Sequence, residues 1–137
     1  MSKAKLTSLD VNQVGTVGEY LVTTMLLADG YDAHRVDTVG YDVLLRLEDG
    51  LAVRIDVKTT AKAKDYYQFT IKKGQKNKFR NHISSDCDLL AFVCLESMNV
   101  LFVLSDDCDG KEKYSISRAK FDSACPYESL YECLAAL

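Results

Sequence analysis

Two aspartates and a lysine on neighbouring apolar runs are the residues of this sequence best suited to chemistry. Asp42 lies in the alternating run 41–47, and Asp56 and Lys58 lie two residues apart in the next run, 51–58. If the two runs pair as a hairpin, the carboxylates come close together, and like charges opposite each other in a sheet repel. A divalent cation between them would relieve that repulsion, and Mg²⁺ prefers oxygen ligands. The pattern therefore favours a metal site with a lysine beside it.

The hydrophobic alternation of the two runs predicts how they pair. A two-residue loop would place each apolar side chain opposite a polar one, whereas the three-residue loop 48–50 matches apolar with apolar. Gly50 then takes the left-handed position that such loops need, which costs glycine nothing sterically. Opposed Cβ atoms lie about 4.5–5.5 Å apart, so two opposed carboxylates can reach one ion. The expected pairs are Leu47 with Leu51, Leu45 with Val53, Val43 with Ile55 and Tyr41 with Val57 on one face, and Leu44 with Arg54 and Asp42 with Asp56 on the other.

A third carboxylate comes from an expected helix over residues 10–28. Asp10 and Gln13 form a capping-box pattern at its start. Glu19 lies on the same side as the apolar stripe and therefore points toward the interior, where a carboxylate needs a partner. The expected partners are the metal, its waters or Lys58. The stripe consists of Val14, Leu21, Val22, Met25 and Leu26.

The order of these residues resembles a known family. Gly18-Glu19 in the first helix, then Gly40-Tyr41-Asp42, then Asp56-Val57-Lys58 resembles the PD-(D/E)xK nuclease superfamily, whose small members include Holliday-junction resolvases and intron homing endonucleases. The resemblance covers about residues 14–104, most of the chain. D-x-K alone occurs by chance in many proteins, and the ordered set is more specific. Tyr41 departs from the pattern, because the named motif has proline at that place.

The resemblance implies a fold, an activity and roles for single residues. It implies a single α/β domain over residues 1–137, with a restriction-endonuclease-like mixed central β-sheet flanked by helices. The implied activity is that of an Mg²⁺-dependent DNA endonuclease of homing or restriction type, with Mn²⁺ as a substitute ion. Asp42, Asp56 and the backbone carbonyl of Val57 would bind the metal, Lys58 would orient the attacking water and offset phosphate charge, and Glu19 would hold a metal-bound water or a second ion.

Other interpretations of the same residues stay open. The hairpin could be half-exposed, with Asp56 and Lys58 as ordinary solvated charges. Within the nuclease family, a structure-selective Holliday-junction resolvase is an alternative to a sequence-reading enzyme. A catalytically inactive nuclease-fold module that binds DNA or protein is another.

A strongly basic segment directly follows the proposed site. Residues 58–80 carry eight basic side chains against the single acidic Asp65, in a chain whose formal net charge is −3. Lysines bind phosphates without reading sequence, so the segment favours a contact with double-stranded or branched DNA. A solvated loop that keeps the protein soluble is the alternative. The expected DNA-binding residues are Thr59, Lys62, Lys64, Lys72, Lys73, Lys76, Lys78 and Arg80.

Length and composition favour a small soluble enzyme. The 137 residues include no apolar run suited to a membrane span and no secretion signal at the start. The five cysteines form no CxxC pair, which favours reduced thiols in the cytoplasm and argues against zinc. Because so small a chain cannot wrap duplex DNA alone, we expect a symmetric homodimer or homotetramer. The helix 127–137 or the strands within 88–104 could form the interface.

The remaining elements are expected to supply the scaffold. We expect a short edge strand over 33–37, strands over 65–71 and 113–117, and a basic loop or short helix over 74–82. Two near-continuous apolar runs suit strands buried on both faces. The two histidines, His34 and His82, are expected to be structural or surface residues. The buried strands are 88–95 and 99–104, and an amphipathic helix covers 127–137.

Overall fold

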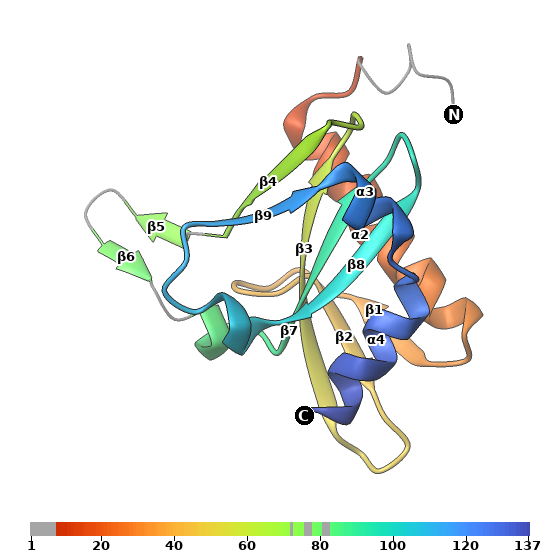
Figure 1. The fold of residues 1–137 in the computed structure, drawn as a ribbon. Helices are drawn as coiled ribbons and strands as arrows, with labels where there is room; N and C mark the ends of the chain where they lie inside the picture. Colours follow the sequence, from red (N-terminus) through yellow and green to blue (C-terminus); the bar gives the residue numbers. More distant parts are fainter. Residues whose placement is uncertain (1–7, 72, 76–77, 81–82) are drawn as a thin grey trace.

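A computed structural model describes residues 8–71, 73–75, 78–80 and 83–137. At its centre is a five-stranded sheet in the order β1-β2-β3-β7-β8 (Figure 1). β3 and β7 pair in parallel, and the other neighbours pair antiparallel. The prediction of a mixed central sheet is therefore confirmed. The strands are β1 (Asp32–Arg35), β2 (Val43–Arg46), β3 (Ala52–Thr60), β7 (Leu89–Cys94) and β8 (Asn99–Leu104).

Two helices cover one face of this sheet. They are α2 (Val11–Ala28) and α4 (Pro126–Ala135), and Leu26 and Leu130 from them pack into one core with the strands. The predicted capping box is confirmed, because Gln13 N donates to Asp10 Oδ1 at 2.8 Å and Asp10 N donates to Gln13 Oε1 at 2.9 Å. No helix within the described ranges is long and apolar enough to span a membrane.

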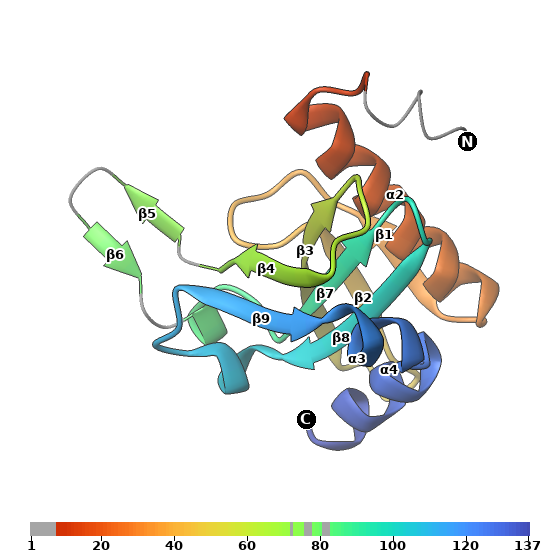
Figure 2. The same ribbon diagram turned by 45° about the horizontal axis from the view of Figure 1, so that its top comes forward.

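A two-stranded ribbon and a short helix cover the opposite face. The ribbon consists of β4 (Tyr66–Thr70) and β9 (Lys113–Ser117), which pair antiparallel (Figure 2). Phe69 of β4 packs against Phe92 of β7, with ring centroids 4.8 Å apart. The helix α3 (Arg118–Ser123) adds Phe121 to this second core. Both strands were expected from the sequence, whereas α3 was not.

The β2–β3 hairpin has the predicted register over most of its length. Val43 lies opposite Ile55, Leu44 opposite Arg54 and Leu45 opposite Val53. Leu47 N donates to Leu51 O at 2.9 Å, which closes the three-residue loop, and Gly50 has a φ of +87° as that loop requires. The hydrophobic face thus set the register.

The ladder changes at its end, next to Asp42. Asp42 N donates to Ile55 O at 2.9 Å, although the strand partner of Ile55 is Val43. Two residues of one strand thus face one residue of the other, which is the arrangement of a β-bulge. The expected pairing of Tyr41 with Val57 on one face is therefore wrong: Val57 packs with the helix-side core, and Tyr41 packs with the ribbon-side core.

The segment after β4 differs from the loop or short helix that was expected. It contains two short paired strands, β5 (Lys73–Gln75) and β6 (Lys78–Arg80). Two 3₁₀ turns follow in the chain, η1 (Ile83–Ser85) and η2 (Ser105–Cys108). His82 lies outside the described residues.

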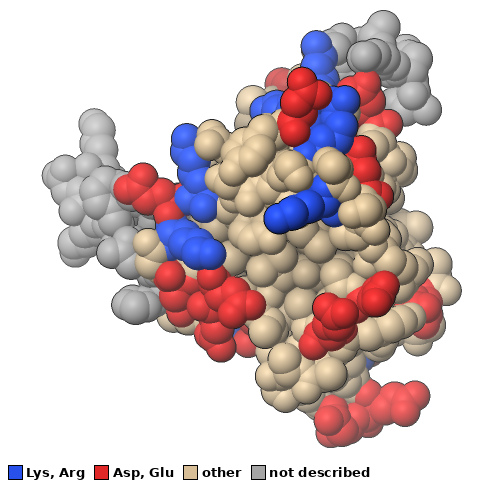
Figure 3. Space-filling view, in the orientation of Figure 1, with Lys and Arg blue, Asp and Glu red and all other residues tan. Residues whose placement is uncertain are grey.

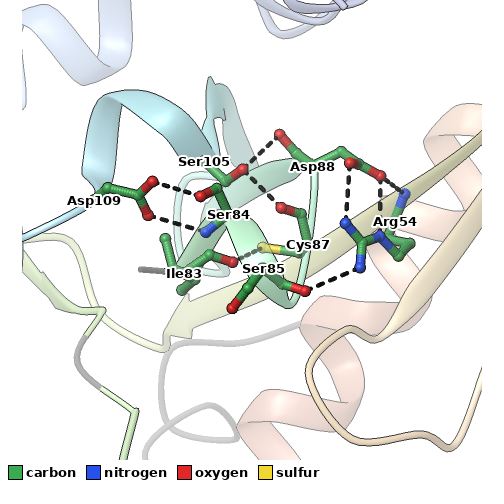
Figure 4. A network of polar contacts seen from close by, with 8 residues as sticks. All are labelled: Arg54, Ile83, Ser84, Ser85, Cys87, Asp88, Ser105 and Asp109. Atoms are coloured by element: carbon green, nitrogen blue, oxygen red, sulfur yellow. Dashed lines mark hydrogen bonds and ion pairs between the residues drawn. The ribbon is translucent and has the colours of Figure 1, made fainter. Parts of the chain in front are cut away.

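A polar network fixes the start of β7 against β3. Asp88 accepts hydrogen bonds from the backbone N and from Nε and Nη2 of Arg54, at 2.8–3.2 Å (Figure 4). Arg54 Nη1 also donates to Ser85 O at 3.2 Å. Ser84 binds Asp109 through both its amide and its hydroxyl. Side chains therefore tie both 3₁₀ turns to the sheet beside the hairpin that carries the carboxylates.

Candidate active site

Two carboxyl groups meet at the edge of β3, where β2 has ended. Asp42 Oδ2 accepts a hydrogen bond from Val57 N at 2.8 Å. The carboxylate thus takes the place of the backbone carbonyl that a longer β2 would have offered to Val57. Asp56 alternates with the core residues of β3, so its side chain points to the ribbon side and is 4% exposed. The carboxyl groups of Asp42 and Asp56 are within hydrogen-bonding reach of each other. The bulge thus brings the two acids together although they form no ladder pair.

The environment of Asp42 opposes its negative charge. Burial raises the pKa of the Asp42 carboxyl to about 7, and the hydrogen bond and negative charge of Asp56 act in the same direction. The charge of Glu19 adds a smaller increase, and the hydrogen bond from Val57 N lowers the pKa. Near neutral pH, the folded protein therefore gains free energy from a proton or a cation beside Asp42.

Lys58 supplies one positive charge to this pair. Its Nζ lies 3.3 Å from Oδ2 of Asp56, and its side chain is 25% exposed. The two residues are two positions apart on one strand and share its ribbon-side face. Lys58 can therefore contact the acid and a molecule in solvent at once. It does not replace a cation between the carboxylates, because the pKa of Asp42 is raised although this lysine is present.

The oxygen atoms at this edge fit a magnesium ion. The N–H and C=O of a strand residue point to the same side, so the Val57 carbonyl faces the edge on which its amide meets Asp42. Among the described residues, no three histidine, cysteine or acidic side chains form one metal-binding group. Mg²⁺ needs no such cage, since it binds one or two carboxylates and keeps several waters. Asp42, Asp56 and the Val57 carbonyl fit that requirement.

Glu19 has a partner that was not expected. Arg35 Nε, on the edge strand β1, donates to Glu19 Oε1 at 3.1 Å. The guanidinium of Arg35 also lies 4.9 Å from the centre of the Tyr20 ring. Glu19 is near enough to Asp42 to raise its pKa, so the acid stays beside the carboxylate pair. The pairing of Arg35 with Glu19 could not be predicted from the sequence, because a single arginine in a short strand matches no motif.

We predict that Arg35→Ala reduces turnover more than stability. The Arg35–Glu19 pair is partly exposed, so its loss costs about 0–1 kcal/mol of unfolding free energy. If Glu19 has the role that the resemblance to nucleases implies, its release lowers kcat roughly tenfold with little change in KM. Arg35→Lys is expected to retain more activity than Arg35→Ala, because lysine keeps the positive charge but lacks the several N–H donors of a guanidinium. Arg46→Ala, in the neighbouring strand β2, is the matched control. Equal kcat for Arg35→Ala and this control would contradict the prediction.

Thr59 lies at the contact between helix α2 and β3. A Cβ on Gly18 would fall 1.8 Å from Thr59 Oγ1, so the helix and β3 touch where glycine leaves space. Thr59 Oγ1 is buried and, within the described residues, has no hydrogen-bond partner. The expected contact of Thr59 with DNA phosphate stays a prediction, and Thr59 also belongs to the lining of the groove beside the site. The close contact sets the distance of Glu19, the next residue of α2, from the strand.

A groove of about 570 Å³ runs beside the site, between the start of α2 and β4. Lys58 and Lys64 line it, together with Gln68 and Thr70 of β4. In Figure 3, lysine and arginine gather in the half of the visible face that contains β4 and β9. The groove therefore offers positive charge directly next to the carboxylate pair.

A larger hollow of about 1130 Å³ lies at the other end of β3, near Ala52. Its lining includes four acidic residues and a single basic one, Arg46. These carboxylates would repel phosphates, so the larger hollow is unsuited to a polyanionic ligand. The four acidic residues are Asp29, Asp32, Glu48 and Asp49.

The remaining expected DNA-binding residues are located only in part. Lys62 and Lys64 are exposed in the turn between β3 and β4. Lys73, Lys78 and Arg80 belong to β5 and β6, of which the structure describes the backbone. Lys72 and Lys76 lie outside the described residues. His34 is exposed and contacts Asp32 at 2.6 Å, which fits the expected surface role.

The raised pKa of Asp42 predicts a pH dependence of stability. Its pKa is about 7 in the folded chain and near 3.8 when unfolded, so between these values the folded state holds a proton that the unfolded state lacks. The free energy of unfolding should then fall as pH rises from about 4 to about 7, and this contribution should be constant at higher pH. Asp42→Asn, which keeps an oxygen for Val57 N, should remove this slope. Urea unfolding of both proteins across this pH range tests the prediction, and equal slopes would contradict it.

Comparisons with known proteins identify the fold that carries this site. No family model and no curated protein matches the sequence. The structure is similar to that of a bacterial homing endonuclease, with a TM-score of 0.65 and 13% identity over 91% of each chain. It is also similar to Hjc, a Holliday junction resolvase from Archaeoglobus fulgidus, with a TM-score of 0.54 and 12% identity over 86% of this chain and 95% of that one. The chain therefore has the fold of the small PD-(D/E)xK-type nucleases, as its motif order predicts.

Proposed function

We propose that this protein is an Mg²⁺-dependent endonuclease that hydrolyses phosphodiester bonds in DNA. The observation that carries the proposal is the meeting of Asp42 and Asp56 at the edge of β3, with Lys58 at 3.3 Å from Asp56. Two negative charges held together in a partly buried site repel each other, and a bound cation would relieve that repulsion. The nuclease fold of the chain supports this assignment, since its structural neighbours are a homing endonuclease and a Holliday junction resolvase.

The residues around the carboxylate pair have separable tasks. Asp42, Asp56 and the Val57 carbonyl would hold Mg²⁺, which when bound stabilises negative charge on phosphate and makes water more acidic. Mn²⁺, with the same preference for oxygen, would substitute for it. Lys58 donates a hydrogen bond to the incoming water or to a non-bridging phosphate oxygen. Glu19, held by Arg35, accepts a proton or a hydrogen bond from water on the α2 side of the site.

The DNA substrate lies in the groove between α2 and β4. Lys58 and Lys64 line that groove, and they attract phosphates without reading bases. Two strands of a duplex require two cuts, so a symmetric homodimer or homotetramer would give one site per strand. β7 is fully buried and cannot form that interface, whereas the half-buried edge strand β8 and α4, where Tyr131 is 46% exposed, remain candidates.

A nicking assay tests the proposal. Supercoiled plasmid, linear duplex and a four-way junction are incubated with the protein in Mg²⁺, in Mn²⁺ and in EDTA. We expect strand cleavage in either metal and none in EDTA. Preference for the junction would assign the protein to the resolvases, and preference for linear duplex to the sequence-reading enzymes. Cleavage of none of these substrates, or equal cleavage in EDTA, would contradict the proposed function.

A further inference from the structure

We propose that the outward face of the β4–β9 ribbon reads base edges in the major groove of duplex DNA. This inference rests on the proposed function and narrows its substrate to duplex DNA with a sequence preference. The ribbon has one buried face and one face in solvent. Tyr67 and Phe69 occupy the buried face, and Tyr66, Gln68 and Thr70 are exposed on the other.

The outward face carries hydrogen-bonding side chains and no carboxylate. Register places the outward residues of the two strands in three directly opposed pairs, all of which can donate or accept hydrogen bonds. The only charge among them is positive, although acidic residues outnumber basic ones in the chain as a whole. Such a face is complementary to DNA. The pairs are Tyr66 with Ser117, Gln68 with Ser115 and Thr70 with Lys113.

The shape of the ribbon fits the groove that exposes the most sequence information. The major groove is about 12 Å wide and admits a two-stranded β-ribbon. The amide of Gln68 can bond the N6 and N7 edge of adenine, a hydroxyl such as that of Thr70 can contact any base, and Lys113 suits guanine. Gln68 and Lys113 can therefore discriminate bases, and the hydroxyl groups add contacts that any base accepts.

The outward face continues into the catalytic groove. Gln68 and Thr70 line the same groove of about 570 Å³ as Lys58 and Lys64. A backbone strand held there by lysines would present its neighbouring base edges to β4. Reading and cutting would then take place on one continuous surface, with phosphate contacts on one side and base contacts on the other.

The ribbon is held firmly enough to position these side chains. Tyr67 packs on Phe121 and Phe69 on Phe92, each with ring centroids 4.8 Å apart. At the end of the ribbon, Arg118 Nε donates to Lys64 O at 2.8 Å. Base reading needs side chains on a rigid support, because small displacements break hydrogen bonds to base edges.

The experiment separates reading from cutting. The 137-residue protein selects DNA from a library of duplexes with a randomised central segment, by gel shift in EDTA, so that no cleavage competes. We expect a defined base-pair pattern. Gln68→Ala should relax the preference at one or two adjacent positions by roughly 5- to 100-fold. Lys64→Ala is the matched control, and it should weaken binding to all sequences and lower the salt slope by about one.

Two results would overturn the inference: selection of no sequence pattern by the wild type, or an unchanged pattern in both Gln68→Ala and Thr70→Ala. These failures are distinct from a failure of the proposed function. If the protein nicks DNA but selects no sequence pattern, the proposed nuclease function stands and the base-reading role of the ribbon is refuted. If the protein selects a sequence pattern but never nicks DNA, the base-reading role of the ribbon is supported and the proposed nuclease function is refuted.

Discussion

Asp56→Asn should abolish DNA cleavage and leave the protein folded. The substitution keeps the shape of a side chain that is 4% exposed but removes the charge that would bind Mg²⁺. Loss of one group that stabilises charge in a transition state typically costs 10²–10³ in rate, and loss of a metal ligand should reach at least about 10³. Because the repulsion with Asp42 also disappears, we expect the free energy of unfolding at pH 8 to stay equal or to rise.

The control for this prediction is Asp65→Asn. Asp65 lies in the same stretch of chain, is fully exposed and pairs with Arg118 at 3.5 Å. Its substitution should change neither cleavage nor stability measurably. Cleavage is measured as single-turnover nicking of a plasmid, and folding by circular dichroism and urea unfolding. If Asp56→Asn retained more than about a tenth of the wild-type rate, the carboxylate pair would not be the catalytic centre.

Gly18→Ala should destabilise the protein by about 2–4 kcal/mol, although alanine favours helix. The new Cβ would lie 1.8 Å from Thr59 Oγ1, so α2 has to move away from β3 or the strand has to shift. Because Glu19 is the next residue, cleavage should fall as well. Gly15→Ala in the same helix meets no atom within 4 Å and should stabilise by about 0.5–1 kcal/mol. The two alanine substitutions thus have opposite expected signs.

A double-mutant cycle identifies the contact responsible. Thr59→Ala removes the hydroxyl, which would lie 1.8 Å from a Cβ on Gly18, and the methyl at 2.8 Å, and leaves the β-carbon, also at 2.8 Å. The double variant should therefore be more stable than the sum of the two single effects, with an interaction energy of about 1–2 kcal/mol. Urea unfolding of the four proteins gives this value. Simple additivity would show that the helix and strand are not in close contact at this point.

The central hairpin could be derived from sequence because burial and turn chemistry agree there. The alternation of Val43 and Leu45 against Val53 and Ile55 leaves one register in which apolar side chains share a face, and Gly50 fits its loop. The capping box of α2 is equally local. Each of these features depends on residues close together in the chain, so spacing alone carries the information.

The features that sequence did not reveal depend on tertiary context. The bulge at Asp42 adds one residue to a strand without changing the composition around it, so Tyr41 was assigned to the wrong face. The pairing of Arg35 with Glu19 joins residues from β1 and α2 through the fold alone. Thr59 is a good strand residue on any face, and only the crossing of Gly18 over β3 shows that its hydroxyl is covered.

Segments with little hydrophobic periodicity were the least predictable. The basic stretch after β4 forms the strands β5 and β6 rather than the loop or helix expected of it. Phe121 is the one buried residue of α3, so no apolar stripe predicts this helix. The N-cap hydrogen bond from Lys120 N to Ser117 Oγ is only a weak local signal. Where burial does not fix a pattern, several backbone arrangements satisfy the same sequence.

The most direct test of the carboxylate pair is the anomalous scattering of Mn²⁺ in crystals of the wild-type protein soaked near pH 8. We expect one strong peak at the edge of β3, about 2 Å from a carboxylate oxygen of Asp42 and of Asp56, and no such peak in Asp56→Asn crystals. No peak between these two acids, at Mn²⁺ concentrations that support cleavage, would contradict the account.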